Sequence, residues 1–561
     1  MSLKPPYLTP LSADGQVATL LALANLLRSE GRSGHALPLL EHLATLRPDR
    51  TDVRLAHVGV LGEEGRTLEA LDALLNLRLQ QSHAAALLPA IQTEGARAIE
   101  AFNGHVGRGE VAEAERYASA LAKLMPDNPA MLASAMSCNQ ALGRPGEAQR
   151  YAQVLVGLEP ENVQARTLLA EAAKAAGAVD NEVEHLAILA LSPQNPIAPL
   201  IRLRDLHDVA GLILCRPLTP KSRQQLAVIL DGARTLSVEA EAGSEWEAWA
   251  NHYRLLIDAL DMDLALAPPK PRPEAKVSLA SSTGAKLDWA AVKARADKAG
   301  VEAIFFAAAD EAYIDLYARW FALSVRRYCD VPLLVVIHVI GGEGQLKRIA
   351  AKVGIDDERL VFSADAFDAE AAGRTACWDA PPKGRIDKPV AHLQSVRFLL
   401  LGTLLKKLAR PVFVSDIDLI LQRGVSDLLA RHAGADLVLN ENEVTFNAGS
   451  RITANLLLAY PTAHAHGFLD AVAGYLDDRL GRAEVSRWID QVALTLGRHN
   501  LQENSPAARI GYFDTTSDIN NVMYPSFQEH PFRFLSLFHG FDTSSLEDPR
   551  VLSPEPERGA A

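Results

Sequence analysis

Cysteine is scarce in this sequence of 561 residues, and its distribution suggests no metal or disulfide site. The four cysteines are far apart and form no CxxC pair: Cys138, Cys215, Cys329 and Cys377. This spacing argues against both a zinc knuckle and a disulfide framework. We therefore expect a reducing, cytoplasmic environment.

Long apolar runs and an excess of basic charge are also missing. No run of about 18 apolar residues occurs, and the first residues, MSLKPPYLTPLSADG, lack the apolar core of a secretory signal. We expect a soluble protein without an integral membrane segment. The formal net charge of −13 disfavours binding to nucleic acid or to an anionic membrane, because both depend on clustered Lys and Arg.

The remaining composition is that of a folded globular protein. Hydrophobic residues make up 48% and charged residues 22%, which argues against extended disorder. A chain of this length exceeds what one hydrophobic core normally organises, so we expect at least two domains.

The first half of the chain contains an internal repeat. A glycine is followed five residues later by an alanine, and often seventeen residues later by a proline. The pairs are Gly31 and Ala36, Gly65 and Ala70, Gly109 and Ala114, and Gly143 and Ala148, with a degraded copy at Gly177. Three of the four steps between the glycines are 34 residues, and the 44-residue step after Gly65 indicates an insertion near 83–100.

The repeat has a physical meaning as a series of helix pairs. Glycine allows the positive φ that ends one helix, alanine lets the next helix approach closely, and proline ends the second helix. The pattern resembles the tetratricopeptide repeat family, whose period is also 34 residues. The resemblance implies an all-α solenoid over 1–219 whose concave face docks a protein partner or acceptor.

Composition changes mark the later boundaries. Residues 220–266 continue as amphipathic helices, which we expect to cap the array. Residues 267–290 are rich in Pro, Lys and Ser, as a linker would be. We expect a second domain over 291–561.

Short apolar runs alternate with helical stretches in this second domain. The runs AIFFAAA, PLLVVIHVI, RLVFS, PVFVSDIDLIL and DLVLN predict strands, and 311–328 and 390–408 predict two of the helices. The alternation predicts an α/β domain with a largely parallel sheet, in which ligands bind at the carboxyl ends of the strands.

Two carboxylates, Asp416 and Asp418, follow a buried strand in PVFVSDIDLIL. Residues i and i+2 of an extended chain point to the same side, so both carboxylates can bind one hard cation. Mn²⁺ or Mg²⁺ prefers such oxygen ligands and would bridge them to a diphosphate. An ordinary turn at the strand end also fits the pattern.

From about 300 to 541, the order of motifs resembles the Rossmann-like GT-A nucleotide-diphospho-sugar transferases of glycosyltransferase family eight. The matching segments are FFAAAD, the helix HLQSVRFLLLGTLL, the Asp-Ile-Asp strand, FNAG, WIDQ and FHG. The implied nucleotide-sugar contacts are Ala307, Ala309, Asp310, Tyr313, Arg397, Asp416 and Gly449. The implied catalytic residues are Asn447, Asp490 and Gln491, and the implied metal ligands are Asp416, Asp418 and His539.

Each of these residues also has an ordinary structural interpretation. Asp310 could cap the next helix, and Arg397 could form an ion pair. Asn447 with Gly449 could form a turn, and Asp490 with Gln491 could lie on a solvated helix face.

The chain departs from the family after His539. It reads Phe541-Asp542-Thr543 where the family has a basic segment that contacts phosphate. Lys388, or else Lys383 or Arg385, could supply that contact, although the loop that holds them also fits a plain surface connection.

The resemblance implies a metal-dependent transferase that uses a nucleotide-diphosphate sugar, with a UDP-sugar favoured, and that retains the anomeric configuration. The main alternative is a non-catalytic scaffold with a degenerate GT-A domain, because fold alone does not establish activity. A nucleotidyltransferase fits less well, because the first strand is not followed by a glycine-rich phosphate loop. The acceptor, a protein or a surface-polysaccharide precursor, stays open.

Overall fold

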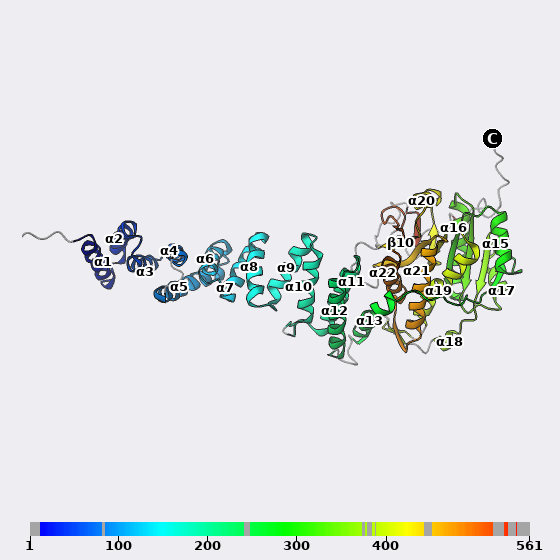
Figure 1. The fold of residues 1–561 in the computed structure, drawn as a ribbon, viewed down its shortest axis with the longest axis horizontal. Helices are drawn as coiled ribbons and strands as arrows, with labels where there is room; N and C mark the ends of the chain where they lie inside the picture. The colour runs from blue at the N-terminus through cyan, green and yellow to red at the C-terminus, as the bar shows by residue number, and fades with distance from the viewer. Residues whose placement is uncertain are drawn as a thin grey trace, which may run out of the picture. The chain divides into compact units, whose positions relative to one another are not determined.

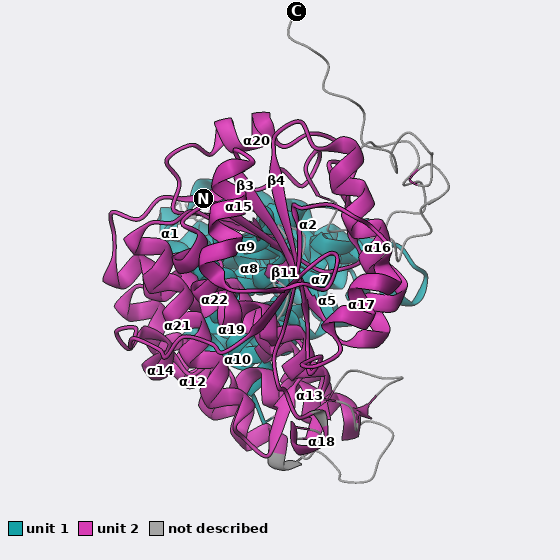
Figure 2. Cartoon of the chain, turned by 90° about the vertical axis from the view of Figure 1, so that its right-hand side faces the viewer, with its two compact units in different colours: residues 1–195 teal, residues 196–561 magenta. Residues whose placement is uncertain are grey.

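The computed structural model divides the chain into two compact units, residues 1–195 and 196–561 (Figure 2). The described residues are 12–80, 85–193, 195–239, 247–372, 376–378, 384–386, 389–441, 451–519, 532–536 and 546. Within these ranges, no helix combines the length and apolar character needed to cross a bilayer.

Unit 1 consists of successive α-helices that pack against their neighbours in the chain (Figure 1). Its α-helices are α1 (Ala13–Ser29), α2 (Ser33–Leu46), α3 (Thr51–Glu63), α4 (Thr67–Gln80), α5 (Leu88–Gly107), α6 (Val111–Leu124), α7 (Pro129–Ala141), α8 (Pro145–Leu158), α9 (Val163–Ala175) and α10 (Val179–Leu191). The insertion predicted near 83–100 coincides with a short 3-10 turn, Ala85–Leu87, and the start of the 20-residue helix α5.

The predicted role of each repeat position is confirmed. All five repeat glycines have positive φ, from +66° at Gly177 to +74° at Gly65. The repeat alanines Ala36, Ala70, Ala114 and Ala148 are fully buried. Helices α2, α6 and α8 each end two residues before a repeat proline. Unit 1 is therefore a repeat of helix pairs, as the 34-residue period predicts.

Unit 2 is built around a mixed sheet of nine strands. In spatial order these are β13 (Ile510–Tyr512), β10 (Leu437–Glu441), β11 (Ile452–Ala459), β8 (Val412–Ser415), β3 (Ala303–Ala309), β4 (Leu333–Val339), β5 (Leu360–Ala364), β1 (Ser278–Ser281) and β2 (Lys286–Leu287). The central strands β8, β3, β4 and β5 are parallel, whereas β11 and β1 on either side run antiparallel to them. Strands β10 and β13 also pair in parallel, so the predicted, largely parallel sheet is interrupted by the reversed strands β11 and β1.

Two smaller sheets complete the strands of unit 2. One contains β12 (Glu484–Ser486), β6 (Ala376–Trp378) and β7 (Arg385–Ile386), and the other pairs β14 (Phe534–Ser536) with β9 (Leu419–Leu421).

Helices cover both faces of the main sheet (Figure 2). Helices α16 (Glu311–Tyr328) and α17 (Leu346–Val353) pack on one face, and α19 (Val390–Leu408) and α22 (Ile489–Asn504) pack on the other, with α21 (Ala463–Leu480) against them. The remaining helices of the unit are α11 (Pro199–Leu214), α12 (Pro220–Glu239), α13 (Glu247–Asp258), α14 (Met262–Leu266), α15 (Trp289–Lys298), α18 (Ala369–Ala372) and α20 (Ser426–Arg431).

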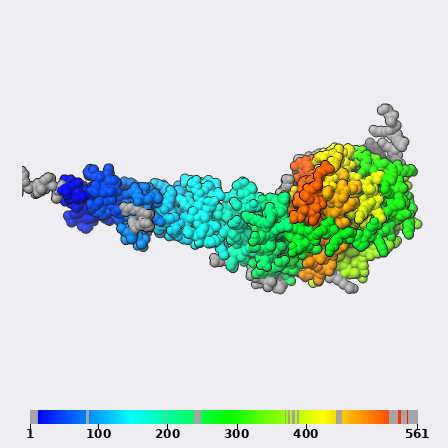
Figure 3. Space-filling model, in the orientation of Figure 1, coloured from blue at the N-terminus to red at the C-terminus, as the bar shows by residue number. Residues whose placement is uncertain are grey.

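The structure differs from the predicted boundaries at two places. Helices α11 to α14 belong to unit 2, where Asn500 of α22 donates a hydrogen bond of 2.8 Å to the carbonyl of Ala267, just after α14. Segments far apart in the sequence thus lie side by side in this unit (Figure 3). The predicted linker 267–290 contains β1 and β2, because its apolar residues complete the edge of the sheet.

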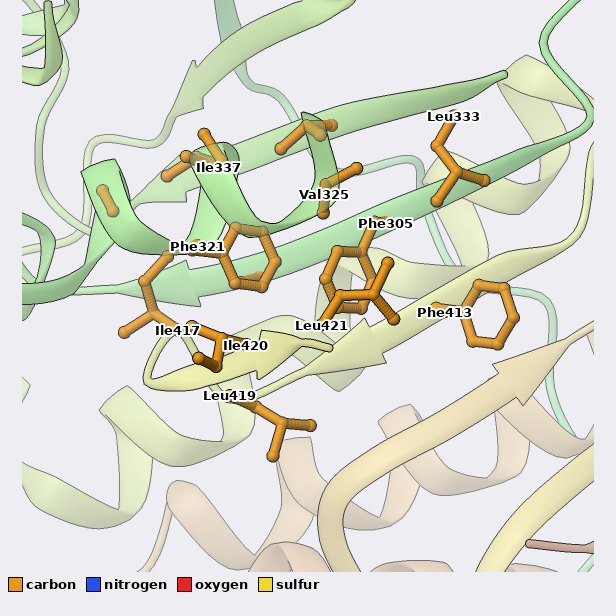
Figure 4. Packing of buried hydrophobic residues seen from close by; sticks show 14 of the residues in the cluster. Phe305, Phe321, Val325, Leu333, Ile337, Phe413, Ile417, Leu419, Ile420 and Leu421 are labelled. Atoms are coloured by element: carbon orange, nitrogen blue, oxygen red, sulfur yellow. The ribbon is translucent and has the colours of Figure 1, made fainter. Parts of the chain in front are cut away.

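The apolar core beneath α16 fixes the turn that carries the two aspartates (Figure 4). Phe305 of β3 stacks on Phe321 of α16 with ring centroids 4.6 Å apart. Ile417, between Asp416 and Asp418, is 3% exposed and lies in the same core, as does Ile420 of β9. Burial of Ile417 therefore holds this turn in place.

Candidate functional site

Three carboxylates and one guanidinium meet at the carboxyl end of β8. Asp416 follows β8, Asp418 precedes β9, Asp490 lies in the first turn of α22, and Arg397 comes from the middle of α19. We call Asp416, Asp418, Asp490 and Arg397 the acidic cluster. Their elements are widely separated in the sequence, so the sheet and its covering helices assemble the cluster.

Arg397 links two of the carboxylates. It donates one hydrogen bond to Asp416 Oδ1 and another, of 3.3 Å, to Asp490 Oδ2. Its side chain is 6% exposed and that of Asp490 is 3% exposed. Burial alone would lower the pKa of Arg397, but Asp416 and Asp490 outweigh burial and raise the pKa, so the guanidinium stays charged.

Asp490 is an acid in a nearly water-free environment. Burial raises its pKa to about 6, although Arg397 acts in the opposite direction. The residue two positions before it, Trp488, has φ of +69°, a left-handed conformation that bulky residues rarely adopt. The start of α22 thus combines a strained backbone with a buried acid, a combination that is frequent at functional sites.

Asp418 is half-buried, and its pKa is raised to about 6 by this partial burial and by the charge of Asp416. Its carboxylate accepts a hydrogen bond of 3.1 Å from the hydroxyl of Ser536. Ser536 ends β14, where it pairs with Leu419 of β9. A strand from near the C-terminus thereby reaches the acidic cluster.

The backbone at Asp416 and Asp418 differs from the extended strand that we predicted. Strand β8 ends at Ser415, and a turn, closed by a hydrogen bond of 3.2 Å from Leu419 N to Asp416 O, leads into β9. The turn forms because β9 leaves the main sheet to pair with β14. The two carboxylates still interact, since the charge of Asp416 raises the pKa of Asp418.

The charge of the acidic cluster is unbalanced at neutral pH. Three ionised carboxylates against one guanidinium leave a formal charge of −2. Within the described ranges, no group of three or more His, Cys, Asp and Glu side chains is arranged to hold a metal ion. The predicted third ligand, His539, lies outside those ranges, three residues after Ser536 in the sequence.

The residues predicted at the first strand lie at its carboxyl end. Ala307 and Ala309 are buried in the core beneath α16. Asp310 caps α16, accepting a hydrogen bond of 3.0 Å from the backbone N–H of Tyr313. The Tyr313 side chain is exposed, and its pKa is raised by partial burial and by the charges of Tyr317 and Asp418. Tyr313 therefore borders the acidic cluster.

Three other predicted residues, Asn447, Gly449 and Lys388, lie outside the described part of the chain. The described residues on either side of 442–450 are joined, because Glu441 accepts a 3.0 Å hydrogen bond from Arg451 and another of 3.0 Å from Arg498 of α22.

Gln491 follows Asp490 in the first turn of α22. Its backbone N–H donates a 3.0 Å hydrogen bond to the Asp490 carboxylate. In the described part of the structure, its side-chain oxygen has no hydrogen-bond partner. Arg385, the alternative to Lys388 as a phosphate contact, is exposed in β7.

A buried polar network on strands β4 and β5 was not identified from the sequence. His338 of β4 lies with Nδ1 3.0 Å from the Ser363 hydroxyl and Nε2 3.1 Å from Asp365 Oδ2. Asp365 also accepts a hydrogen bond of 2.7 Å from Gly341 N, which fixes the loop after β4. The available signal was a polar residue inside each of the apolar runs PLLVVIHVI and RLVFS. Ser536 and the left-handed Trp488 gave no such signal.

Comparisons with known proteins add structural neighbours but no sequence relative. No protein-family model matches the chain, and no curated protein matches it significantly. The neighbours include a thermophilic TPR protein of Thermus thermophilus, which is 18% identical to this chain. The match covers 35% of this chain and 99% of that protein, with a TM-score of 0.15. They also include PilF of Pseudomonas aeruginosa, which is 13% identical. That match covers 40% of this chain and 90% of PilF, with a TM-score of 0.18.

A glycosyltransferase is also among these neighbours. Mouse xyloside xylosyltransferase 1, in its apo form, is 10% identical to this chain. The match covers 39% of this chain and 87% of that protein, with a TM-score of 0.25. The chain is thus a helical repeat followed by a mixed-sheet region, with TPR proteins and one transferase among its structural neighbours.

Proposed function

We propose that the chain is a metal-dependent glycosyltransferase that moves a sugar from a nucleotide-diphosphate donor to a protein or glycan acceptor. The observation that carries the proposal is the buried Arg397, which joins Asp416 and Asp490 at the carboxyl end of β8. Ligands of open α/β sheets bind at that end of the strands. The repeats of unit 1 would dock the acceptor or another protein partner.

The acidic cluster fits a divalent cation such as Mn²⁺ or Mg²⁺. Asp416 and Asp418 offer hard oxygen ligands, and two added charges would balance the formal −2 of the cluster. The raised pKa of Asp418, caused by burial and by Asp416, reflects a repulsion that a cation would relieve. When bound, such an ion supplies positive charge to the departing diphosphate.

Arg397 acts as the positioning residue of the cluster. Its two hydrogen bonds hold the carboxylates of Asp416 and Asp490 at fixed places. Asp490, with a pKa of about 6, exchanges its proton near neutral pH and can therefore donate a hydrogen bond to a sugar hydroxyl or accept one from it. Together the two residues orient the donor sugar.

The residues outside the described ranges are consistent with this assignment on chain length alone. In the sequence, His539 is three residues after Ser536, whose hydroxyl contacts Asp418. Asn447 and Gly449 lie in the sequence between Glu441 and Arg451, which pair with each other. Glu441 also pairs with Arg498, which lies eight residues, about 12 Å along α22, from Asp490. Tyr313 presents an exposed ring on which a nucleobase can stack.

Nucleotide binding tests the proposal. UDP, GDP and dTDP are each added with and without Mn²⁺, and the thermal unfolding of unit 2 is followed. We expect stabilisation by one nucleotide only with Mn²⁺, of about 2.7 kcal/mol when its concentration is 100 times Kd. Asp418→Asn should abolish the stabilisation. Asp297→Asn, the same change at an exposed aspartate of α15 that pairs with Lys293 and Arg410, should preserve it.

Two results would go against the proposal. If no nucleotide stabilises the wild-type chain with Mn²⁺, the non-catalytic scaffold is the better interpretation. If Asp418→Asn is stabilised as strongly as the wild type, the nucleotide binds elsewhere. A panel of UDP-, GDP- and dTDP-sugars, assayed for hydrolysis with Mn²⁺, then identifies the donor.

A further inference from the structure

A cavity of about 260 Å³ lies within unit 2, behind the first turn of α22. Its walls come from α13, the end of α21, β12 and Ile489, and no residue of the acidic cluster lines it. The exposed residues Arg482 and Glu484 form one end, whereas Ser486 and Ile489 at the other end are buried. The volume is below the roughly 300–1,000 Å³ of sites for drug-sized molecules and suits a single sugar ring.

The lining offers hydrogen-bond donors and acceptors side by side. Arg254 pairs with Glu484 at 2.9 Å and with Asp258 at 3.6 Å, and all three line the cavity. A simple anion would face both carboxylates, and a simple cation would face arginines. A hydroxyl group can accept a hydrogen bond from an arginine and donate one to a carboxylate at the same time, so this lining favours a neutral polyhydroxylated ligand.

The rest of the lining is consistent with such a ligand. Leu255, Val485 and Ile489 provide an apolar wall against which the C–H face of a sugar ring can pack. The Ser486 hydroxyl is fully buried and has no hydrogen-bond partner among the described residues. Buried hydroxyls normally have a partner, so this hydroxyl has unused hydrogen-bonding capacity at the wall of the cavity.

We propose that this cavity binds one neutral sugar unit, either a free saccharide or the end of a glycan, at a site separate from the acidic cluster. The occupant contacts β12 and Ile489, which flank the left-handed Trp488 and lead directly into Asp490. Where the proposed transferase function holds, occupancy therefore stabilises the turn that positions Asp490. Binding itself requires neither metal nor nucleotide.

Saturation-transfer NMR on the full-length chain tests the proposal. The probes are the methyl glycosides of glucose, galactose, mannose and N-acetylglucosamine at up to about 10 mM, which covers millimolar affinities. We expect one glycoside to bind the wild type. Arg482→Ala and Ser486→Ala should each weaken that binding at least about tenfold, or about 1.4 kcal/mol.

A matched control comes from unit 1. Like Arg482→Ala, Arg150→Ala removes an exposed arginine that pairs with a carboxylate three or four residues earlier in the sequence, and it should leave glycoside binding unchanged. Circular dichroism verifies that each variant is folded. A disaccharide that binds more tightly than the methyl glycoside assigns the site to a glycan end, and equal binding assigns it to a free saccharide.

Three outcomes overturn the inference: no glycoside binds, binding survives both cavity variants, or inorganic phosphate binds in the cavity while no glycoside does. Because the assay contains no Mn²⁺ and no nucleotide, its failure leaves the proposed transferase function untouched. Conversely, if a glycoside binds but no nucleotide stabilises the chain, the sugar-binding cavity is supported and the proposed transferase function is rejected.

Discussion

Arg150 of unit 1 and Arg397 of unit 2 show two different uses of the same side chain. Arg150 is 76% exposed and pairs with Glu147, one helical turn away, at 2.9 Å. Arg397 is 6% exposed and pairs with carboxylates that lie 19 and 93 residues away. An exposed pair contributes about 0–1 kcal/mol, whereas burying a pair has a desolvation penalty that can exceed the attraction.

The two units also differ in where electrostatically perturbed groups occur. Unit 1 repeats a local arrangement of Gly and Ala, and its stability comes from packing between neighbouring helices. Unit 2 retains a buried guanidinium, two acids with raised pKa and a strained tryptophan at one point. Burying such groups has a desolvation cost, and perturbed groups of this kind accumulate at functional sites.

The largest expected effect comes from removing the buried cation. Arg397→Met should destabilise unit 2 by about 3–5 kcal/mol, because it leaves the buried Asp490 carboxylate without its charged partner. All six tryptophans lie in unit 2, so denaturant unfolding followed by tryptophan fluorescence reports this unit selectively. An unchanged unfolding midpoint would mean that the buried pair is no more important than a surface pair.

A smaller effect is expected from the titration of Asp490. Its pKa is about 6 in the folded chain and about 3.8 when unfolded, so the folded state binds the proton more tightly. Its contribution to stability is therefore fully present below pH 3.8 and is lost as the pH rises to about 6, by up to about 3 kcal/mol.

The neutral variant Asp490→Asn tests this titration. The stability of unit 2 in this variant should depend less on pH between about 4 and 6.5 than in the wild type. The measurement is the unfolding free energy by tryptophan fluorescence at several pH values, with a chelator present to exclude metal effects. Parallel pH profiles for the two proteins would contradict a raised pKa for Asp490.

The repeat unit should respond to backbone changes. Gly143 has φ of +67°, and nothing lies within 4 Å of an added Cβ, so Gly143→Ala should cost about 1–2 kcal/mol through backbone strain alone. Gly157 lies within α8 with equally free space and without positive φ, so Gly157→Ala should stabilise the helix by about 0.5–1 kcal/mol. Hydrogen exchange of the repeat amides measures both, and effects of the same sign would refute the role of φ.

The smallest effect is expected at the surface. Arg150→Ala should change the stability of unit 1 by less than about 0.5 kcal/mol, because its ion pair is exposed to solvent. Hydrogen exchange of the repeat amides is again the measurement. A loss comparable to that of Arg397→Met would remove the contrast between the two units.

Much of the local structure could be predicted. The helices 311–328 and 390–408 and the strand 303–309 were predicted at their observed bounds, because apolar periodicity and capping are properties of neighbouring residues. PVFVSDIDLIL, in contrast, looked like one strand and forms two. The second strand pairs with β14, and the resulting contact between Asp418 and Ser536 joins residues 118 positions apart.

The candidate site also has features that neighbouring residues predict and features that depend on distant contacts. Asp416, Asp418, Arg397 and Asp490 were selected by motif order, but their hydrogen bonds and burial depend on how α19, α22 and β8 pack. The left-handed φ of Trp488 and the network around His338 are likewise set by distant contacts. Residues 267–290 looked like a linker by composition, yet they supply two strands to the sheet edge.

Local residue patterns were sufficient to specify the 34-residue helical repeat and the alternation of strands and helices, since a positive φ at glycine or an apolar period involves only nearby positions. The tertiary structure decided which carboxylates share Arg397, where the chain divides into units, and that a sugar-sized cavity lies behind α22. Those features arise from contacts between distant segments, whose burial and electrostatics do not exist until the chain is folded.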